Sequence, residues 1–148
     1  MDEKKYDCLK LSNQLCFPLY ACARETIKLY TPHLDKIGLT YTQYITMMVL
    51  WERHSMTAKE LGRLLYLDSG TLTPLLKKLE SKNLLTRKRS GEDERNLIIT
   101  LTEKGEALKD QALHIPEEMM KCINLEPEEI SAMYGYLYKL LKVVNEKE

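Results

Sequence analysis

Within residues 57–102 the spacing of hydrophobic residues changes once, from the period of a helix to the alternation of a strand. The stretch "TAKELGRLL" opens with Thr57 and Glu60, whose T-x-x-E spacing is typical of a capping box at the start of a helix. We expect this helix to be short and to end near Leu65. "DSGTLTPLLKKLE" begins three residues later with Asp68 and Ser69, both good helix caps, and predicts a second helix that runs to about Lys82. The segment therefore predicts two helices joined by a tight turn.

The next segment, "LLTRKRSGEDERNLIITLT", has the alternating pattern of β-strands. Leu97, Ile99 and Leu101 fall on one side of the second strand, and "SGED" has the composition of a turn. We expect a two-stranded hairpin with an exposed, charged tip. Two helices and a tight turn followed directly by a hairpin are the elements of a winged helix-turn-helix.

Helices are also expected on both sides of this segment. Residues 11–30 keep one apolar face, and Pro32 is expected to end that helix. Pro18 lacks a backbone donor, so the helix is either kinked there or begins later. Three more helices are predicted at about 42–54, 103–122 and 127–145.

These elements predict one mainly α domain that spans residues 1–148. We assign about 40–102 to a winged helix-turn-helix with a two-stranded β wing. The flanking segments, about 9–32 and 103–146, carry apolar stripes that a small winged domain cannot cover alone. We expect them to be dimerisation helices, which pair with the same helices of a second copy.

Composition excludes several classes of protein. The 22 basic and 22 acidic residues cancel, so any nucleic-acid-binding surface must be local. No stretch approaches the roughly 18 apolar residues of a membrane span, and the charged N-terminus lacks the apolar core of a signal peptide. We expect a cytoplasmic protein with no membrane partner. The four cysteines form no C-x-x-C pair and the three histidines lie far apart, so we expect no metal and no cofactor.

The second helix of the helix-turn-helix has the residues of a DNA-contacting surface. Small residues at its start allow close approach to bases and phosphates, and lysines follow one to two turns later. Six basic residues against two acidic ones lie between positions 68 and 91. The alternative is an ordinary capped helix with a solvated basic face. The candidate DNA-binding residues here are Ser69, Gly70, Thr71, Thr73, Pro74, Lys77, Lys78 and Arg87.

The hairpin tip, "GEDERN", places Arg95 among acidic residues. It is either a solvated turn or a second contact with DNA. In the second case Asp93 orients the guanidinium of Arg95, which then enters a narrow minor groove of negative potential.

Cys16, in "NQLCFPLYACARE", also has two interpretations. Free cysteines are often small buried hydrophobes. A reactive cysteine needs its thiolate form, which backbone donors at a helix N-terminus stabilise, and Cys16 falls within the first turns of its helix. Tyr20 lies one turn further on and offers a hydroxyl donor. We expect Cys22 to pack in the core and Cys8 to be an exposed thiol.

The chain resembles a known family over residues 9 to 145. "LDSGTLTPLLKKLE" followed by "LLTRKRSGEDERNLIITLTEKG" is similar to the MarR family of dimeric winged-helix regulators, with the D-x-R motif of its wing. "NQLCFPLYACARE" and "GLTYTQYITMMVLWE" look like the organic-hydroperoxide-sensing branch, that of the OhrR-like repressors.

The resemblance implies a role for particular residues. Cys16 would be the peroxide-sensing thiol, supported by tyrosines across the dimer interface at the positions of Tyr20, Tyr30 and Tyr41. Some family members complete oxidation with a low-molecular-weight thiol. Others form a disulfide with a second cysteine in the C-terminal helical region of the partner, where Cys122 falls as the candidate resolving residue.

We therefore expect a homodimeric repressor that binds an inverted-repeat operator in double-stranded DNA and releases it when an organic hydroperoxide oxidises Cys16. Phe17, Tyr20, Tyr41 and Trp51 are candidates for an apolar pocket that favours organic peroxides. One alternative is a regulator of the same fold released by a small aromatic ligand without oxidation. The other is a thiol peroxidase, but no cluster of catalytic His, Asp or Glu is evident around Cys16, so we expect no enzyme.

Overall fold

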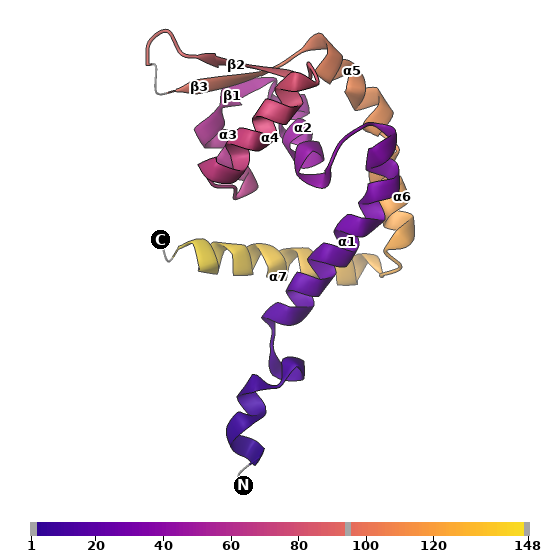
Figure 1. Cartoon of the computed structure of the whole chain (residues 1–148). Coiled ribbons are helices and arrows are strands. Elements are labelled where there is room, and N and C mark those ends of the chain that lie inside the picture. Colours follow the sequence, from indigo (N-terminus) through magenta and orange to yellow (C-terminus); the bar gives the residue numbers. More distant parts are fainter. Residues whose placement is uncertain (1–2, 94–95, 147–148) are drawn as a thin grey trace. The chain divides into compact units, whose positions relative to one another are not determined.

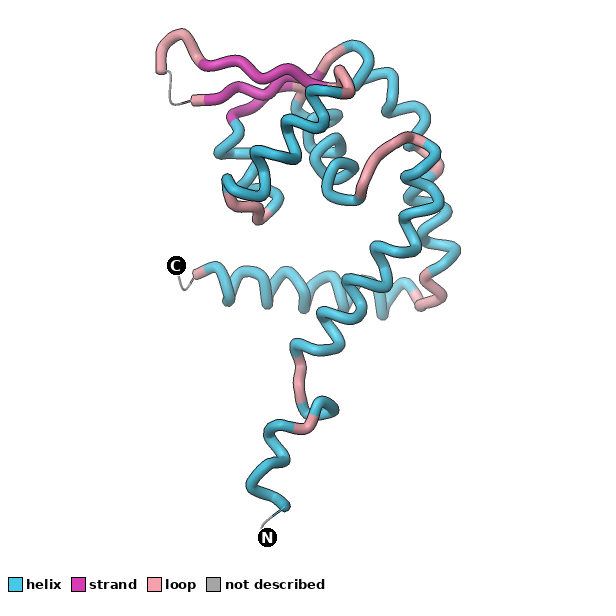
Figure 2. Tube along the Cα trace, viewed as in Figure 1, coloured by secondary structure: helices cyan, strands magenta, loops and turns pink. Residues whose placement is uncertain are grey.

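The computed structural model describes residues 3–93 and 96–146. These residues fall into two compact units, one ending at Ile115 and the other beginning at Pro116. Figure 1 labels the elements and Figure 2 separates helices, strands and loops. The elements in chain order are η1 (Glu3–Leu9), η2 (Leu11–Asn13), α1 (Cys16–Lys36), α2 (Tyr41–Arg53), β1 (Ser55–Thr57), α3 (Ala58–Leu65), α4 (Ser69–Ser81), β2 (Leu85–Arg89), β3 (Leu97–Leu101), α5 (Glu103–Ala112), α6 (Ile115–Cys122) and α7 (Pro127–Asn145).

Helix α1 begins later and ends later than the sequence pattern predicted. Pro18 is its third residue, where a missing N–H costs nothing because the first turn has no intrahelical acceptor. The expectation that Pro32 ends the helix is wrong. Pro32 removes one backbone hydrogen bond, and the helix continues for another turn because Leu34, 2% exposed, is part of the core. Gly38, at a φ of 67°, then makes the turn into α2.

Helices α2, α3 and α4 form the predicted helix-turn-helix and its support. Thr40 and Gln43 make a capping box at the start of α2, and Thr57 and Glu60 make the predicted one at the start of α3. The core between these helices consists of aliphatic side chains with 0–1% exposure: Met47, Leu50, Leu61, Leu76 and Leu79. The bounds predicted for α3 and α4 are confirmed to within one residue.

The wing belongs to a sheet with one strand more than predicted. Strands β2 and β3 pair antiparallel, from Leu85 opposite Leu101 to Arg89 opposite Leu97. The added strand, β1, pairs with the other edge of β3 and places Met56 opposite Ile99, so the order is β1-β3-β2. A strand of three residues shows no periodicity in a sequence.

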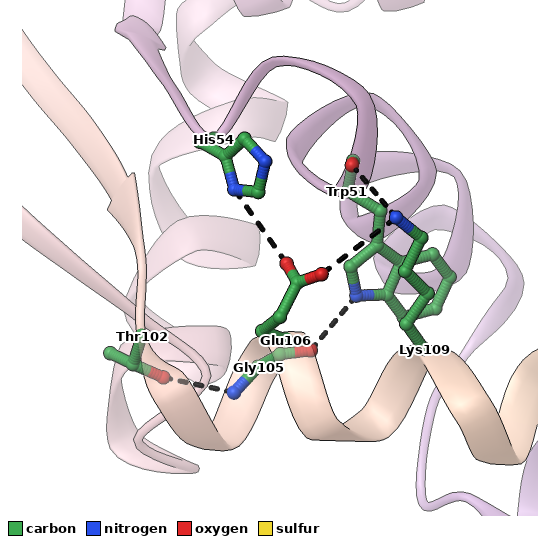
Figure 3. Close-up of polar contacts among 6 residues, drawn as sticks. All are labelled: Trp51, His54, Thr102, Gly105, Glu106 and Lys109. Atoms are coloured by element: carbon green, nitrogen blue, oxygen red, sulfur yellow. Dashed lines mark hydrogen bonds and ion pairs between the residues drawn. The ribbon is translucent and has the colours of Figure 1, made fainter.

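A polar joint fixes α5 to the end of α2 (Figure 3). The indole N–H of Trp51 donates to the carbonyl of Gly105 at 2.8 Å. The ammonium of Lys109 donates to the carbonyl of Trp51 at 3.3 Å, and Nδ1 of His54 lies 3.6 Å from a carboxylate oxygen of Glu106. A Cβ added at Gly105 would lie 2.1 Å from the carbonyl oxygen of Leu84, so only glycine fits this joint.

The single helix predicted over residues 103–122 is wrong, because it is interrupted between α5 and α6. Pro116 cannot donate to the carbonyl of Ala112, which explains a break at this point. The last helix has the predicted bounds and begins at Pro127. None of its described residues is buried, and its apolar side chains include Tyr134, 63% exposed.

Candidate DNA-binding surface and thiol site

Helix α4 has one apolar face and one polar face. Leu72, Leu75, Leu76 and Leu79 are buried, with at most 7% exposure. The other α4 positions face solvent, apart from the half-buried Glu80. They include every α4 residue that the sequence proposed for DNA contact: Ser69, Gly70, Thr71, Thr73, Pro74, Lys77 and Lys78. The leucine spacing thus aims small polar residues and two lysines away from the core, as a DNA-reading helix requires.

Asp68 fixes the start of α4. Its Oδ1 accepts the backbone N–H of Thr71 at 2.8 Å, and its Oδ2 accepts the Thr71 hydroxyl at 3.3 Å. A Cβ added at Gly70 would lie 3.1 Å from Asp68 Oδ1. The cap therefore favours glycine at position 70, and the backbone is left open at the end of the helix that would face DNA.

Arg87 is bound to α4. Its Nε and Nη2 atoms donate to Oε2 of Glu80 at 2.9 and 2.8 Å, and its backbone N–H donates to Oε1 at 3.1 Å. The hydrogen bonds from Arg87 lower the pKa of Glu80, chiefly through the guanidinium. These contacts hold strand β2 against α4. A direct contact between Arg87 and DNA stays a prediction.

Lys82 is also engaged within the fold. Its ammonium donates to the carbonyl of Gly38 and to Oε1 of Gln43. It therefore contributes less to an open basic surface than its place in the sequence suggested. Lysines such as Lys77 and Lys78 on the exposed face are better placed to meet phosphates.

The wing turn closes through Asp93 and Asn96. The backbone N–H of Asn96 donates to the Asp93 carbonyl at 2.9 Å, and its side-chain amide donates to the Asp93 carboxylate at 3.3 Å. Arg95 lies outside the described residues. Its insertion in a minor groove, with Asp93 as its orienting partner, stays a prediction.

Cys16 is the first residue of α1, and its thiol is exposed. Cys8, Cys22 and Cys122 are free and exposed as well. The expectation that Cys22 packs in the core of this chain is wrong. Helix α1 buries only Leu34, so its N-terminal half has no core of its own chain to enter. Cys122 is the last residue of α6, in the second unit.

The predicted tyrosines fall into two groups. Tyr30 and Tyr41 lie together, with ring centroids 5.0 Å apart, and Tyr44 lies 6.0 Å from Tyr30. Burial, and then the neighbouring tyrosine, raises the pKa of Tyr30, and burial likewise raises that of Tyr44. Both hydroxyls therefore stay neutral donors at physiological pH. Tyr44 adds a member to this cluster that the sequence resemblance did not indicate.

The tyrosine pair cannot reach the thiol of its own chain. Tyr30 lies fourteen residues after Cys16 in one continuous helix, which corresponds to about 21 Å along the axis. Tyr20 is one turn from Cys16, and the guanidinium of Arg24 lies 5.3 Å from the centre of its ring. Any contact between Cys16 and the Tyr30–Tyr41 pair must therefore come from a second copy of the chain.

The aromatic pocket suggested around Cys16 does not form with Trp51. Trp51 is 7% exposed, packs beside Tyr44 and uses its indole N–H on Gly105, so it is a core residue. Phe17 and Tyr20 remain exposed on α1. Among the described residues, no group of three or more His, Cys, Asp or Glu side chains is arranged to hold a metal ion. Nor does any described helix combine the length and apolar character that crossing a bilayer requires.

A helix-turn-helix with an attached wing, an exposed basic helix and an exposed N-terminal thiol define a winged-helix regulator. The comparisons with known proteins agree. The model of the family "Transcriptional regulator SarA/Rot" matches residues 28–112. The chain is 48% identical over 145 residues to the organic hydroperoxide resistance transcriptional regulator of Bacillus subtilis, covering 98% of this chain and 99% of that protein.

Two further relatives extend the comparison. The HTH-type transcriptional regulator SarZ of Staphylococcus epidermidis is 47% identical over 119 residues, 80% of each chain. AbfR bound to DNA has been solved in reduced and in overoxidised form, each 36% identical, with a TM-score of 0.76 over 95% of this chain and 98% of that one. A disulfide-formed AbfR has a TM-score of 0.62 over 99% of each chain. The chain belongs to the MarR-type winged-helix transcriptional regulators, in the branch of the organic hydroperoxide resistance regulator.

Proposed function

We propose that the protein is a homodimeric repressor that binds an inverted-repeat operator and releases it when an organic hydroperoxide oxidises Cys16. The observation that carries this proposal is the exposed thiol at the first residue of α1. Backbone N–H groups of a first helical turn have no intrahelical acceptor and stabilise an anion. A low-molecular-weight thiol, or Cys122, is the proposed partner in the later oxidation steps.

The chemistry follows from a thiolate at this position. The sulfur attacks the outer oxygen of the hydroperoxide, the O–O bond breaks, and the alcohol leaves after taking a proton. Cys16 becomes a sulfenic acid. A second thiol then attacks this sulfur, forms a disulfide and releases water. The sensor is consumed once per event, so we propose a stoichiometric switch in the cytoplasm that is not an enzyme.

The tyrosines support the same proposal in the dimer. Tyr30 lies about 21 Å along α1 from Cys16 of its own chain, and the ring of Tyr41 packs beside Tyr30. We therefore propose that each tyrosine pair donates hydrogen bonds to the thiolate of the partner. Oxidation replaces that anion with a bulkier group bonded in another way. The two DNA-binding helices then lose the spacing that two half-sites demand.

Binding to a fluorescent inverted-repeat duplex, before and after one equivalent of cumene hydroperoxide, tests the proposal. Wild type should bind when reduced and dissociate after oxidation, with sulfenic acid or disulfide at Cys16 by mass spectrometry. Cys16→Ser should bind and stay bound, while Cys22→Ser, a matched control on the same helix, should dissociate like wild type. Release of Cys16→Ser by the peroxide would reject Cys16 as the sensor. Release by an aromatic acid in a cysteine-free variant would instead support the ligand-driven alternative.

A further inference from the structure

The last turn of α4 and the residues after it meet both helices that lead away from the DNA-binding region. We call residues 80–84 the α4 junction. On one side, the Lys82 ammonium donates to the carbonyl of Gly38 and, at 3.0 Å, to Oε1 of Gln43. These acceptors belong to the turn after α1 and to the start of α2.

On its other side the junction holds the start of α5. The ammonium of Lys104 donates to the carbonyl of Lys82 at 2.9 Å. The hydroxyl of Thr102, the N-cap of α5, donates to the carbonyl of Asn83 at 2.7 Å and accepts the N–H of Gly105 at 3.0 Å. Lys82 therefore lies between the helix that begins at Cys16 and the helix that precedes α6 and Cys122.

The contacts of the Lys82 ammonium are hydrogen bonds to neutral groups. Its acceptors are a backbone carbonyl and a buried amide, 3% exposed, and not a carboxylate. Gln43 Oε1 also accepts the N–H of Thr40 at 3.2 Å, so it keeps one partner if the ammonium is removed. A hydrogen bond of this type weakens over a few tenths of an ångström. Helix α1 is continuous from Cys16 to Lys36, and the N–H of Gly38 donates to the carbonyl of Asp35 in its last turn. A tilt of α1 as a unit would therefore move Gly38.

We propose that Lys82 is the positioning residue that couples helix α1 to the DNA-reading helix α4. The inference rests on the proposed function, because it supplies the route by which oxidation at Cys16 reaches DNA. In the reduced protein the ammonium holds α4 at a fixed place on the α1–α2 turn. When α1 moves, this contact makes α4 move with it, so the winged helix-turn-helix does not keep its position.

Lys82→Met tests the coupling, since it keeps most of the apolar stem and removes only the charged donor. Lys78→Met is the matched control, because Lys78 is an exposed lysine of α4, one turn before the C-cap residue Lys82. Operator affinity is measured for the reduced and the oxidised forms of each variant over a range of salt concentrations. Circular dichroism verifies that each variant is folded.

For Lys82→Met we expect reduced-state affinity to fall about threefold or more, with the salt dependence unchanged. The ratio of oxidised to reduced dissociation constants should fall by a similar factor. Lys78→Met should weaken both forms equally, keep the ratio, and lower the slope of log affinity against log salt by about one. Lys82→Arg, which keeps donors at this point, should restore the ratio at least in part.

Two results would overturn the coupling role. One is a Lys82→Met protein with wild-type affinity in the reduced state; the other is loss of affinity together with a reduced salt slope, which would make Lys82 a phosphate contact. If Lys82→Met does not fold, Gln43→Met replaces it and must give the same loss at unchanged slope. Failure of wild type to respond to peroxide would refute sensing by Cys16, while the reduced-state affinities would still decide the role of Lys82.

Discussion

At the scale of single residues, one residue type has different roles at different positions of this chain. Lys77 and Lys78 face solvent on α4, whereas Lys82, one turn later, binds acceptors inside the fold. Cys16 and Cys22 lie on one helix, but only Cys16 is in its first turn. The surroundings of each side chain, and not its type, decide which substitution affects DNA binding and which affects stability.

Trp51→Phe should lower the free energy of unfolding by about 1–3 kcal/mol, because the carbonyl of Gly105 loses its buried donor. Chemical denaturation monitored by circular dichroism measures this change. Tyr136→Phe is the control, since Tyr136 is 73% exposed and should stay within about 0.5 kcal/mol of wild type. Equal stability of Trp51→Phe and wild type would show that the α2–α5 joint does not depend on this hydrogen bond.

At the scale of elements, α4 is held at both ends by side chains. Asp68 caps its N-terminus, and Glu80 near its C-terminus binds Arg87 of β2. The first contact fixes the end of the helix that would meet DNA, and the second fixes the wing relative to that helix. Both contacts are made by carboxylates. The position of α4 therefore depends on negatively charged groups, which the phosphates of DNA repel.

Asp68→Ala should destabilise the protein by about 0.5–2 kcal/mol, since the N–H of Thr71 loses its cap. Asp68→Asn should keep most of this stability, because an amide oxygen also caps a helix. Thermal melts of the two variants separate loss of the cap from loss of charge. If both variants melted equally early, the negative charge and not the cap would be the source of stability.

The Glu80–Arg87 pair predicts a pH dependence of stability. The pKa of Glu80 is lowered below its ordinary value of 4.5 in the fold, mainly by the guanidinium of Arg87. Its contribution is therefore fully present above 4.5 and is lost as pH falls through the lowered value. Free energies of unfolding from pH 6 downward should converge for wild type and Glu80→Gln as the acid limit is approached. If the free energies of unfolding of the two proteins stay parallel over this pH range, the ion pair is not the cause of the pH dependence.

At the scale of the whole molecule, apolar side chains remain exposed on α1 and on α7. Phe17, Tyr20, Ile27 and Leu29 on α1 are each more than 40% exposed. On α7, the rings of Tyr134 and Tyr138 lie 4.6 Å apart without being buried. Regulators of this family act as dimers, so a second copy of the chain is the partner that covers these surfaces.

Tyr134→Glu should shift the protein toward monomers and weaken operator binding, because it places a charge within the apolar stripe of α7. Tyr136→Glu is the matched control, since position 136 lies about 200° around the helix from position 134. Light scattering after size exclusion gives the oligomeric state, and anisotropy gives the DNA affinity. A Tyr134→Glu protein that remains a dimer with full affinity would place the dimer interface elsewhere.

The sequence by itself determined the elements whose signals are local. The capping box at Thr57, the cap at Asp68, the alternation from Leu97 to Leu101 and the stripe of α7 each depend on residues a few positions apart. Such short-range preferences act wherever the segment lies in the fold. The exposed face of α4, and with it the candidate DNA-contacting residues of that helix, follows from the spacing of four leucines.

Only the tertiary structure decided the features that depend on distant partners. Helix α1 continues past Pro32 because Leu34 is buried, and β1 exists because it pairs with β3. Trp51 is a core residue that binds Gly105, 54 positions away, and Lys82 contacts Gly38, 44 positions away. Arg87 binds Glu80 because β2 folds back against α4. A sequence pattern gives the type of side chain at a position, but the atoms that surround it come from elsewhere in the chain, and they fix whether it packs, binds or stays exposed.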